Sequence, residues 1–201
     1  MWLHEPHTPF HTVPKYRWRF RHLENEADNI YASVLSHADD RVGEVLDELD
    51  RLELTENTLV IFSSDNGPAR SSRPAELGLM HDTATGAGYN VAAAKGITGG
   101  RKGYKSSLFE GGIGVPFIAR WPGKIPSGRV DKKSILSAVD LLPTFCDVAG
   151  VVLPNDYQPD GISQINALMG NGMTMREQPL FWKFNSPWPP QTSRPHYGHH
   201  Y

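Results

Sequence analysis

The sequence predicts an α/β fold in which a mostly parallel sheet is flanked by helices, and three observations support this. Residues 24–52 repeat apolar side chains three to five positions apart, which is typical of an amphipathic helix. Residues 58–63 form a short apolar run without alternation, which is typical of a strand covered on both faces. A second such run follows at 115–121. Alternating helical and strand patterns favour parallel strands joined through helices.

Length and composition are those of an ordinary globular protein. The 201 residues are enough for one domain with a sizeable core, and 39% hydrophobic with 21% charged residues is average. A formal net charge of −2 offers no basic field for nucleic acid or an anionic membrane surface. No apolar run approaches the roughly 18 residues of a membrane span, and residues 1–6 lack the basic and apolar regions of a signal peptide. The single cysteine, Cys146, excludes an internal disulfide.

The first part of the chain is expected to be a loop followed by the long helix. Residues 4–11 hold three histidines and two prolines, which disfavour a helix or a central strand. These histidines are either incidental in an exposed loop or able to exchange protons in a reactive site. The polar face of the helix at 24–52 is acidic, and we interpret it as solvated. On it, Asp47 and Arg51 are spaced as an ion pair four residues apart.

The strand at 58–63 leads into Asp65, Asn66 and Gly67. Ligands of α/β proteins bind at the carboxyl ends of strands, so Asp65 and Asn66 would be oxygen ligands for a metal. The alternative is a tight Asn-Gly hairpin turn, which needs a second strand at once, and residues 68–74 are a poor candidate for one.

Residues 69–100 form a long connection with no sustained apolar period. Connections of this length are often lids or specificity loops, and we predict such a role here. The connection ends in a glycine-rich stretch at 99–112, in which glycines let the backbone come close to a ligand and cations can serve an oxyanion. The cations are Arg101, Lys102 and Lys105.

The remainder of the chain predicts two helices and a strand. A helix at 134–150 has one apolar face that includes Cys146 as a buried structural thiol, and it tolerates Pro143 if the regular helix begins near Asp140. Asp160 is expected to cap a short helix that runs to Met169. Residues 180–184 resemble a strand, and three histidines follow near the chain end. They are His196, His199 and His200, for which a metal site is the less favoured interpretation.

Several separate motifs, in this order along the chain, are similar to those of the arylsulfatase family. They are His-Glu-Pro-His-Thr-Pro at 4–9, Val-Ile-Phe-Ser-Ser-Asp-Asn-Gly-Pro at 60–68, Lys-Ser-Ser-Leu-Phe-Glu-Gly-Gly at 105–112, Val-Pro-Phe-Ile-Ala-Arg-Trp-Pro-Gly at 115–123, Val-Asp-Leu-Leu-Pro-Thr at 139–144 and Asp-Gly at 160–161. The resemblance extends to about Phe184 and implies the alkaline-phosphatase-like α/β fold. It also implies hydrolysis of sulfate esters, commonly of sugars or aryl alcohols, with a bound calcium ion.

The resemblance assigns roles residue by residue. Asp65 and Asn66 match metal ligands, and their oxygen donors suit Ca²⁺ or Mg²⁺. Lys105 matches the lysine that holds the sulfate group and stabilises charge on the leaving oxygen. His7 matches the histidine beside the leaving oxygen, where it can donate a proton as the ester bond breaks. Lys102, in the same basic stretch, is a further candidate for binding the substrate.

The sequence also departs from the family pattern. The family's nucleophile is a formylglycine made from the Cys or Ser of a Cys/Ser-x-Pro-x-Arg motif, and this sequence contains no such motif. The early aspartates of the metal site are also missing, and in the family they precede the His-Thr-Pro motif. The chain therefore resembles the C-terminal part of a catalytic domain, with residues 1–170 as a partial domain and 171–201 as the truncated start of a smaller subdomain. Gly114 stands where the family often has arginine.

Three interpretations follow. In the first, the chain is a sulfatase segment, inactive alone, whose activity on a small or carbohydrate sulfate ester needs the complete chain or a complementing upstream segment. In the second, it belongs to a phosphomonoester or phosphonate hydrolase of the same fold, because a metal and Lys105 would serve either tetrahedral anion. In the third, it is a non-catalytic remnant. For a complete family member the resemblance implies a periplasmic or secreted location.

Overall fold

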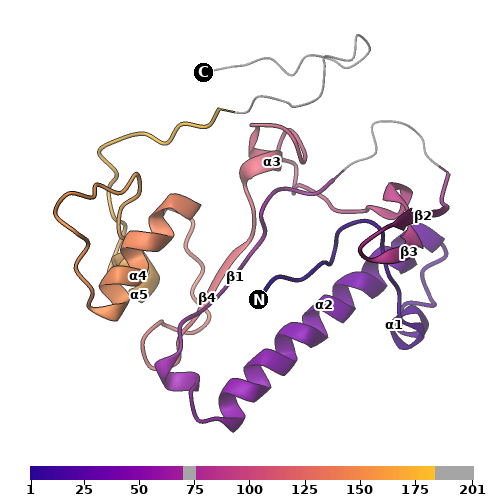
Figure 1. Cartoon of the computed structure of the whole chain (residues 1–201), viewed down its shortest axis with the longest axis horizontal. Coiled ribbons are helices and arrows are strands. Elements are labelled where there is room, and N and C mark those ends of the chain that lie inside the picture. Colours follow the sequence, from indigo (N-terminus) through magenta and orange to yellow (C-terminus); the bar gives the residue numbers. More distant parts are fainter. Residues whose placement is uncertain (70–75, 184–201) are drawn as a thin grey trace. The chain divides into compact units, whose positions relative to one another are not determined.

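The computed structural model describes residues 1–69 and 76–183, and the chain divides into two compact units. Unit 1 contains residues 1–51 and 63–116, and unit 2 contains residues 52–62 and 117–181. Both units mix helices with short strands (Figure 1), as expected for the α/β class. None of the helices within the described ranges has the length and apolarity needed to cross a bilayer.

The longest helix, α2 (Glu26–Arg51), confirms the helix predicted from apolar periodicity. It begins after Asn25, whose Oδ1 accepts the N–H of Asp28 at 3.2 Å. The predicted pairing of Arg51 with Asp47 is wrong. Arg51 instead bonds both carboxylate oxygens of Glu48, at 2.6 and 2.7 Å, because the longer glutamate side chain reaches the guanidinium in a two-pronged contact.

A short helix that the sequence did not predict, α1 (Pro14–Arg19), packs against α2. Pro14 opens it at the position where a missing N–H costs least. Tyr16 is buried, and its hydroxyl donates to Asp40 of α2 at 2.6 Å. The apolar core of unit 1 lies between α2, the N-terminal loop and residues 77–94. Its buried members are Phe10, Ala27, Ile30, Val34 and Ala93.

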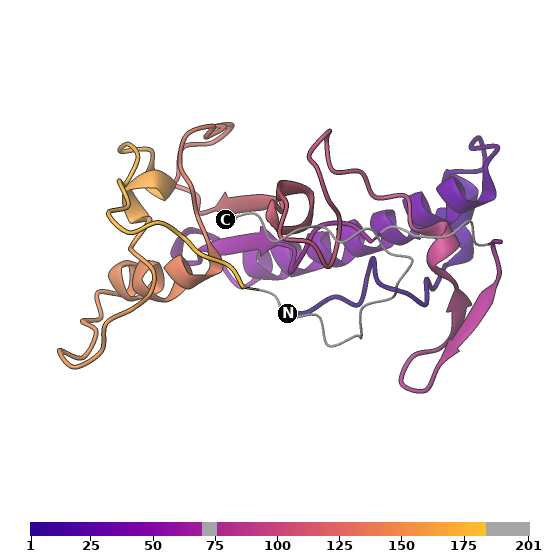
Figure 2. The ribbon, with the colours of Figure 1, turned by 90° about the horizontal axis from the view of Figure 1, so that it is seen from above.

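The two predicted strands exist as β1 (Val60–Ser63) and β4 (Phe117–Arg120), and they pair in a two-stranded sheet. Figure 1 and Figure 2 both show them side by side. Their direction contradicts the prediction. The indole N–H of Trp121, just after β4, donates to the carbonyl oxygen of Glu56, just before β1, at 2.8 Å. The pair is therefore antiparallel, because an apolar run indicates a strand but not its direction.

The strands are also less covered than predicted. Val60 and Ile61 are half-buried, whereas Phe62 of β1 is 42% exposed and Ile118 of β4 is 60% exposed. The described residues thus cover only part of this sheet. Short helical turns lie just before β1, at residues 91–93, and just before β4. They are η1 (Thr55–Asn57), η2 (Val91–Ala93) and α3 (Glu110–Ile113).

The connection predicted to lack regular structure contains a β-hairpin. β2 (Leu79–Asp82) pairs antiparallel with β3 (Gly86–Tyr89), and Figure 2 shows the hairpin as a narrow projection of unit 1. Its turn is fixed by Asp82, whose Oδ1 accepts the N–H groups of Ala84 and Thr85 at 2.8 and 3.0 Å. These bonds hold the pKa of the Asp82 carboxyl below its usual value. The predicted lid or specificity role remains a prediction, and residues 70–75 lie outside the described chain.

The predicted helix at 134–150 appears as η3 (Ala138–Asp140) followed by α4 (Leu141–Ala149). Pro143 lies in the first turn of α4, as predicted. Gly150 ends the helix in the left-handed conformation, with φ of 66°. The start of the regular helix near Asp140 and its end before Gly150 are therefore confirmed, whereas residues 134–137 are not helical, contrary to the prediction.

The buried side of α4 differs from the prediction, because its buried residues are Pro143 and Thr144, with Asp140 just before the helix, and not the apolar stripe. Asp140 and Thr144 are buried, whereas Leu142 and Phe145 on the apolar face are 47% and 43% exposed. Cys146 is only partly buried. Within the described part of unit 2, α4 is therefore held by hydrogen bonds and an ion pair more than by its apolar stripe.

Asp140 is the centre of this polar contact. Its carboxylate accepts the N–H groups of Ser137 at 2.8 Å and Ile162 at 2.9 Å. The same carboxylate pairs with the guanidinium of Arg176, 2.6 Å from Oδ1. The Thr144 hydroxyl donates to the Asp140 carbonyl at 2.6 Å and accepts from the N–H of Gln164 at 2.9 Å. Three separate stretches of unit 2 are thus joined at one fully buried carboxylate.

The last helix, α5 (Ile165–Met169), ends before Gly170 as predicted, but its first flanking residue is Gln164. Asp160 therefore does not cap it, and that prediction is wrong. Residues 180–183 are not in a strand, contrary to the prediction for 180–184. Phe184 and the terminal histidines lie outside the described residues.

Candidate functional site

The two residues predicted to be catalytic lie together in unit 1. Nζ of Lys105 lies 3.1 Å from Nε2 of His7, although the residues are 98 positions apart in the sequence. His7 is exposed and Lys105 is half-buried, so a ligand can reach the pair from solvent. Nothing in the local sequence of either loop requires this contact, and it was expected only from the family resemblance.

The backbone sets the orientation of the His7 ring. Nδ1 of His7 lies 2.7 Å from the carbonyl oxygen of Thr8. Because a carbonyl only accepts, Nδ1 carries the proton in this bond. In a neutral ring, Nε2 then presents a lone pair and accepts a hydrogen bond from the Lys105 ammonium. The hydrogen bond from His7 to the Thr8 carbonyl oxygen could not be predicted from the sequence, because every residue has a backbone carbonyl.

The loop that carries His7 is fixed on both sides. The His7 N–H donates to the carbonyl oxygen of His4 at 2.9 Å. Oε1 of Glu5 lies 3.1 Å from Nδ1 of His37 on α2. Phe10 is buried in the core of unit 1. A position predicted to be a loop is therefore held by tertiary contacts.

The loop that carries Lys105 lies against the residues that follow β1. The Lys105 N–H donates to the carbonyl oxygen of Pro68 at 3.0 Å, and the Gly67 N–H donates to that of Gly112 at 2.8 Å. These bonds bring Lys105 to the carboxyl end of β1, where Asp65 and Asn66 lie. The alternative of a two-residue hairpin at Asn66-Gly67 is excluded, because no strand follows directly in the described residues up to 69.

Glycine is required where these two segments touch. A Cβ at Gly67 would overlap the carbonyl of Gly111 across the two segments, and a Cβ at Gly112 would overlap that of Ser107 within the Lys105 loop itself. The Asp-Asn-Gly and Glu-Gly-Gly motifs thus allow two backbones to approach without side chains between them. Beside Lys105, Ser106 adopts a left-handed conformation with φ of 71°, which is unfavourable for a residue other than glycine.

Asp65 and Asn66 have the oxygen donors that a metal site needs, but they supply too few of them. Asp65 is exposed, and its carboxylate bonds to no residue that the structure describes. The Asn66 amide donates to the carbonyl oxygen of Gly67 at 2.8 Å, so its oxygen points elsewhere. Together they offer at most three side-chain oxygens, whereas Ca²⁺ takes about six to eight ligands. In the described ranges, no three His, Cys, Asp or Glu residues are grouped so that they could hold a metal ion.

The other candidate residues are not part of the His7–Lys105 hydrogen bond itself. The Lys102 ammonium lies over the Phe109 ring, 4.0 Å from its centroid, and the side chain is exposed. The rings of His4 and His7 lie 5.8 Å apart, edge to face, so His4 neighbours the site. At Gly114, a side chain would meet the Glu110 carbonyl oxygen at 2.6 Å, so the local backbone does not accommodate the arginine that is frequent there.

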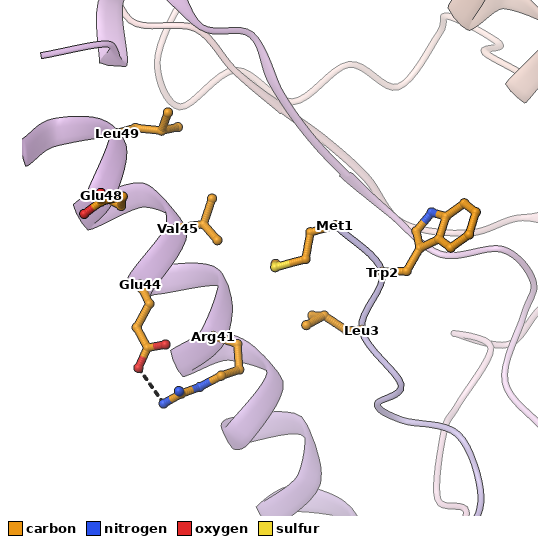
Figure 3. A pocket seen from close by; sticks show the side chains of 8 residues that line it. All are labelled: Met1, Trp2, Leu3, Arg41, Glu44, Val45, Glu48 and Leu49. Carbon is orange, nitrogen blue, oxygen red and sulfur yellow. Dashed lines mark ion pairs between the residues drawn. The ribbon is translucent and has the colours of Figure 1, made fainter. Parts of the chain in front are cut away.

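A separate hollow of about 530 Å³ lies between the N-terminal residues and α2. Figure 3 shows Met1 and Leu3 facing Val45 and Leu49, with the Arg41–Glu44 ion pair at its rim. Its walls are mainly apolar, and neither His7 nor Lys105 lines it. The cation that lines it, Arg41, is paired with Glu44, and the hollow is distinct from the candidate site.

Comparisons with known proteins find related chains. The family model described as Sulfatase matches residues 1–151. The N-acetylgalactosamine-6-sulfatase of Canis lupus familiaris is 34% identical over 152 residues, which are 76% of this chain and 25% of that protein. The N-acetylgalactosamine-6-O-sulfatase of Bacteroides thetaiotaomicron is 32% identical over 72% of this chain and 26% of that protein. The steryl-sulfatase of Homo sapiens is 33% identical over 82% of this chain and 26% of that protein.

Solved structures agree as well. The crystal structure of Ps i-CgsB in complex with k-i-k-neocarrahexaose has a TM-score of 0.66 and 28% sequence identity, covering 83% of this chain and 32% of that chain. The chain spans about a quarter of the length of the curated relatives it matches. Because the family model matches about three quarters of its residues, this chain belongs to the sulfatase family.

Proposed function

We propose that this chain supplies part of the active site of a sulfuric ester hydrolase that acts on sulfated sugars or aryl sulfates, and that it is inactive alone. The hydrogen bond between His7 and Lys105 supports this most directly. It joins a proton-transfer group and a fixed cation in one place, and these are the two groups that cleavage of a sulfate ester needs at its leaving oxygen. The names of the relatives, which include sugar and steryl sulfatases, support the substrate class.

Each residue of the pair has its own task in this proposal. The Lys105 ammonium donates hydrogen bonds to the sulfate and favours the transition state, in which negative charge grows on the leaving oxygen. His7, when its ring carries a second proton at Nε2, donates that proton to the leaving oxygen as the S–O bond breaks. Nε2 and Nζ bond to each other in the structure, so an incoming ester would replace this bond with its own oxygens.

The remaining parts of the site are proposed to come from a longer domain. A formylglycine nucleophile would come from an upstream segment, because this sequence has no Cys/Ser-x-Pro-x-Arg motif. Residues 1–170 would belong to the catalytic domain and 171–201 to a smaller subdomain. The β1–β4 pair would be the antiparallel part of a mostly parallel, alkaline-phosphatase-like sheet flanked by helices. The short, partly covered sheet of the described chain supports this extension.

The proposal is tested with a chimera. Residues 1–201 are joined to the preceding part of the Bacteroides thetaiotaomicron relative and produced with formylglycine formation. We expect turnover of 4-nitrophenyl sulfate by the chimera and none by the chain alone. A folded chimera that hydrolyses 4-nitrophenyl phosphate but not the sulfate would favour the phosphomonoesterase alternative. One that hydrolyses neither would contradict the proposal. The matched control replaces the formylglycine precursor by alanine.

Calcium binding by the chain alone is expected to be weak or absent. Asp65 and Asn66 are the proposed ligands for Ca²⁺ or Mg²⁺, and a bound ion would help to neutralise the sulfate charge. They supply too few oxygens to bind tightly without ligands from elsewhere. Isothermal titration calorimetry with CaCl₂ measures this directly. Tight binding that disappears in Asp65→Ala, but not in Asp47→Ala on the solvated face of α2, would show that the chain holds further ligands.

A further inference from the structure

We propose that the β2–β3 hairpin positions His7, and that Gly88 is the residue that allows it to do so. The inference deepens the proposed function, because it concerns the proton-transfer residue of that site. The hairpin reaches the His7 loop through a pair of backbone hydrogen bonds. The Phe10 N–H donates to the Tyr89 carbonyl oxygen at 2.9 Å, and the Tyr89 N–H donates to that of Phe10 at 3.0 Å. β3 is therefore directly bonded to the loop three residues after His7.

Gly88 lets the two backbones approach. A Cβ at this position would lie 2.7 Å from Cβ of Pro9 and 2.9 Å from the carbonyl oxygen of Phe10. Gly88 is buried and does not adopt a left-handed φ, so an alanine here is opposed by lack of space and not by backbone conformation. Gly86, on the same strand, has φ of 85° and open space around it, so there a side chain is opposed by the backbone conformation and not by lack of space.

Pro9 and Thr8 connect the Gly88 contact to His7. Pro9 follows Thr8, whose carbonyl oxygen accepts the Nδ1 proton of His7 at 2.7 Å. A side chain at position 88 would push Pro9 and turn this carbonyl away from the ring. His7 would then lose the bond that keeps its proton on Nδ1 and its Nε2 lone pair toward Lys105. The hairpin thus decides which nitrogen of the imidazole carries the proton and which presents a lone pair to Lys105.

The proposal is tested by NMR on the chain itself, without any need for turnover. Long-range ¹H–¹⁵N correlation of ¹⁵N-histidine-labelled protein at about pH 8.5, well above the ordinary imidazole pKa of about 6.5, reports the protonated nitrogen. His7→Gln identifies the signals. We expect the Nδ1–H form in the wild type and loss of that form, giving a mixture of tautomers, in Gly88→Ala. The matched control is Ala87→Ser at the exposed neighbour on the same strand, which should keep the Nδ1–H form.

A second variant guards against a folding defect in Gly88→Ala, which circular dichroism would reveal. Tyr89→Pro removes the N–H that bonds to Phe10, and that N–H is not part of the β2–β3 pairing. It should shift the tautomer in the same direction. If folded Gly88→Ala or folded Tyr89→Pro keeps His7 entirely in the Nδ1–H form, the proposal is overturned. Absence of sulfatase activity in the chimera, with the tautomer still dependent on Gly88, would instead refute the proposed function alone.

Discussion

His7→Ala and Lys105→Ala are each expected to lower the turnover of 4-nitrophenyl sulfate by roughly a hundredfold or more in the active chimera. The reason is the 3.1 Å contact between Nε2 and Nζ, which places both groups at one position for a leaving oxygen. Loss of the imidazole removes the proton donor, and loss of the ammonium removes a fixed charge that acts mainly in the transition state. The effect should therefore appear in kcat more than in KM.

The control for this prediction is Lys95→Ala. Lys95 lies in unit 1, and its ammonium pairs with Asp28 at 3.6 Å instead of with the site. Its removal should leave turnover nearly unchanged. Lys102→Ala tests the separate expectation that Lys102 binds substrate, and its stacking on Phe109 predicts a smaller effect than at Lys105. Wild-type turnover in both His7→Ala and Lys105→Ala would remove the proposed roles of the pair.

Asp140→Ala is expected to reduce the free energy of unfolding by about 3–5 kcal/mol, because it removes a fully buried carboxylate and leaves the partly buried Arg176 guanidinium without its partner. The Asp140 carboxylate is fully buried, and it also holds the N–H groups of Ser137 and Ile162. All these groups would lose their acceptor at once. Urea unfolding followed by circular dichroism measures the change as a lower transition midpoint.

Two comparisons separate this mechanism from a general loss of packing. Asp147→Ala removes an exposed carboxylate from α4 itself, and it should shift the urea midpoint far less. The double variant Asp140→Leu with Arg176→Met replaces the buried pair by apolar groups, and it should recover part of the lost stability. A single Asp140→Ala variant with wild-type stability would show that the ion pair contributes little to folding.

Local patterns in the sequence predicted the long regular elements well. Residues 26–51 bury one side of their N-terminal half as the apolar period indicates, and the position of Pro143 and the left-handed Gly150 follow from single-residue chemistry. These features depend on a few neighbouring residues, so a linear reading can find them.

Features that depend on distant partners could not be predicted in this way. The direction of β4 relative to β1 is set by the path of the chain between them, which no apolar run encodes. The β2–β3 hairpin contains Gly86 and Gly88, which disfavour strands, and it is stabilised by the Asp82 turn and the bonds to Phe10. The polar contact face of α4 depends on Arg176, far along the chain. The His7–Lys105 contact belongs to this group too.

The antiparallel β1–β4 pair affects how the chain behaves as a separate molecule in solution. With only two strands, each has one outer edge whose backbone groups no other described strand takes up. Phe62 and Ile118 expose apolar surface on the same pair. An open edge beside apolar side chains is a template for any extended segment, including one from a second copy. Self-association into strand-paired aggregates therefore competes with folding whenever this chain is concentrated on its own.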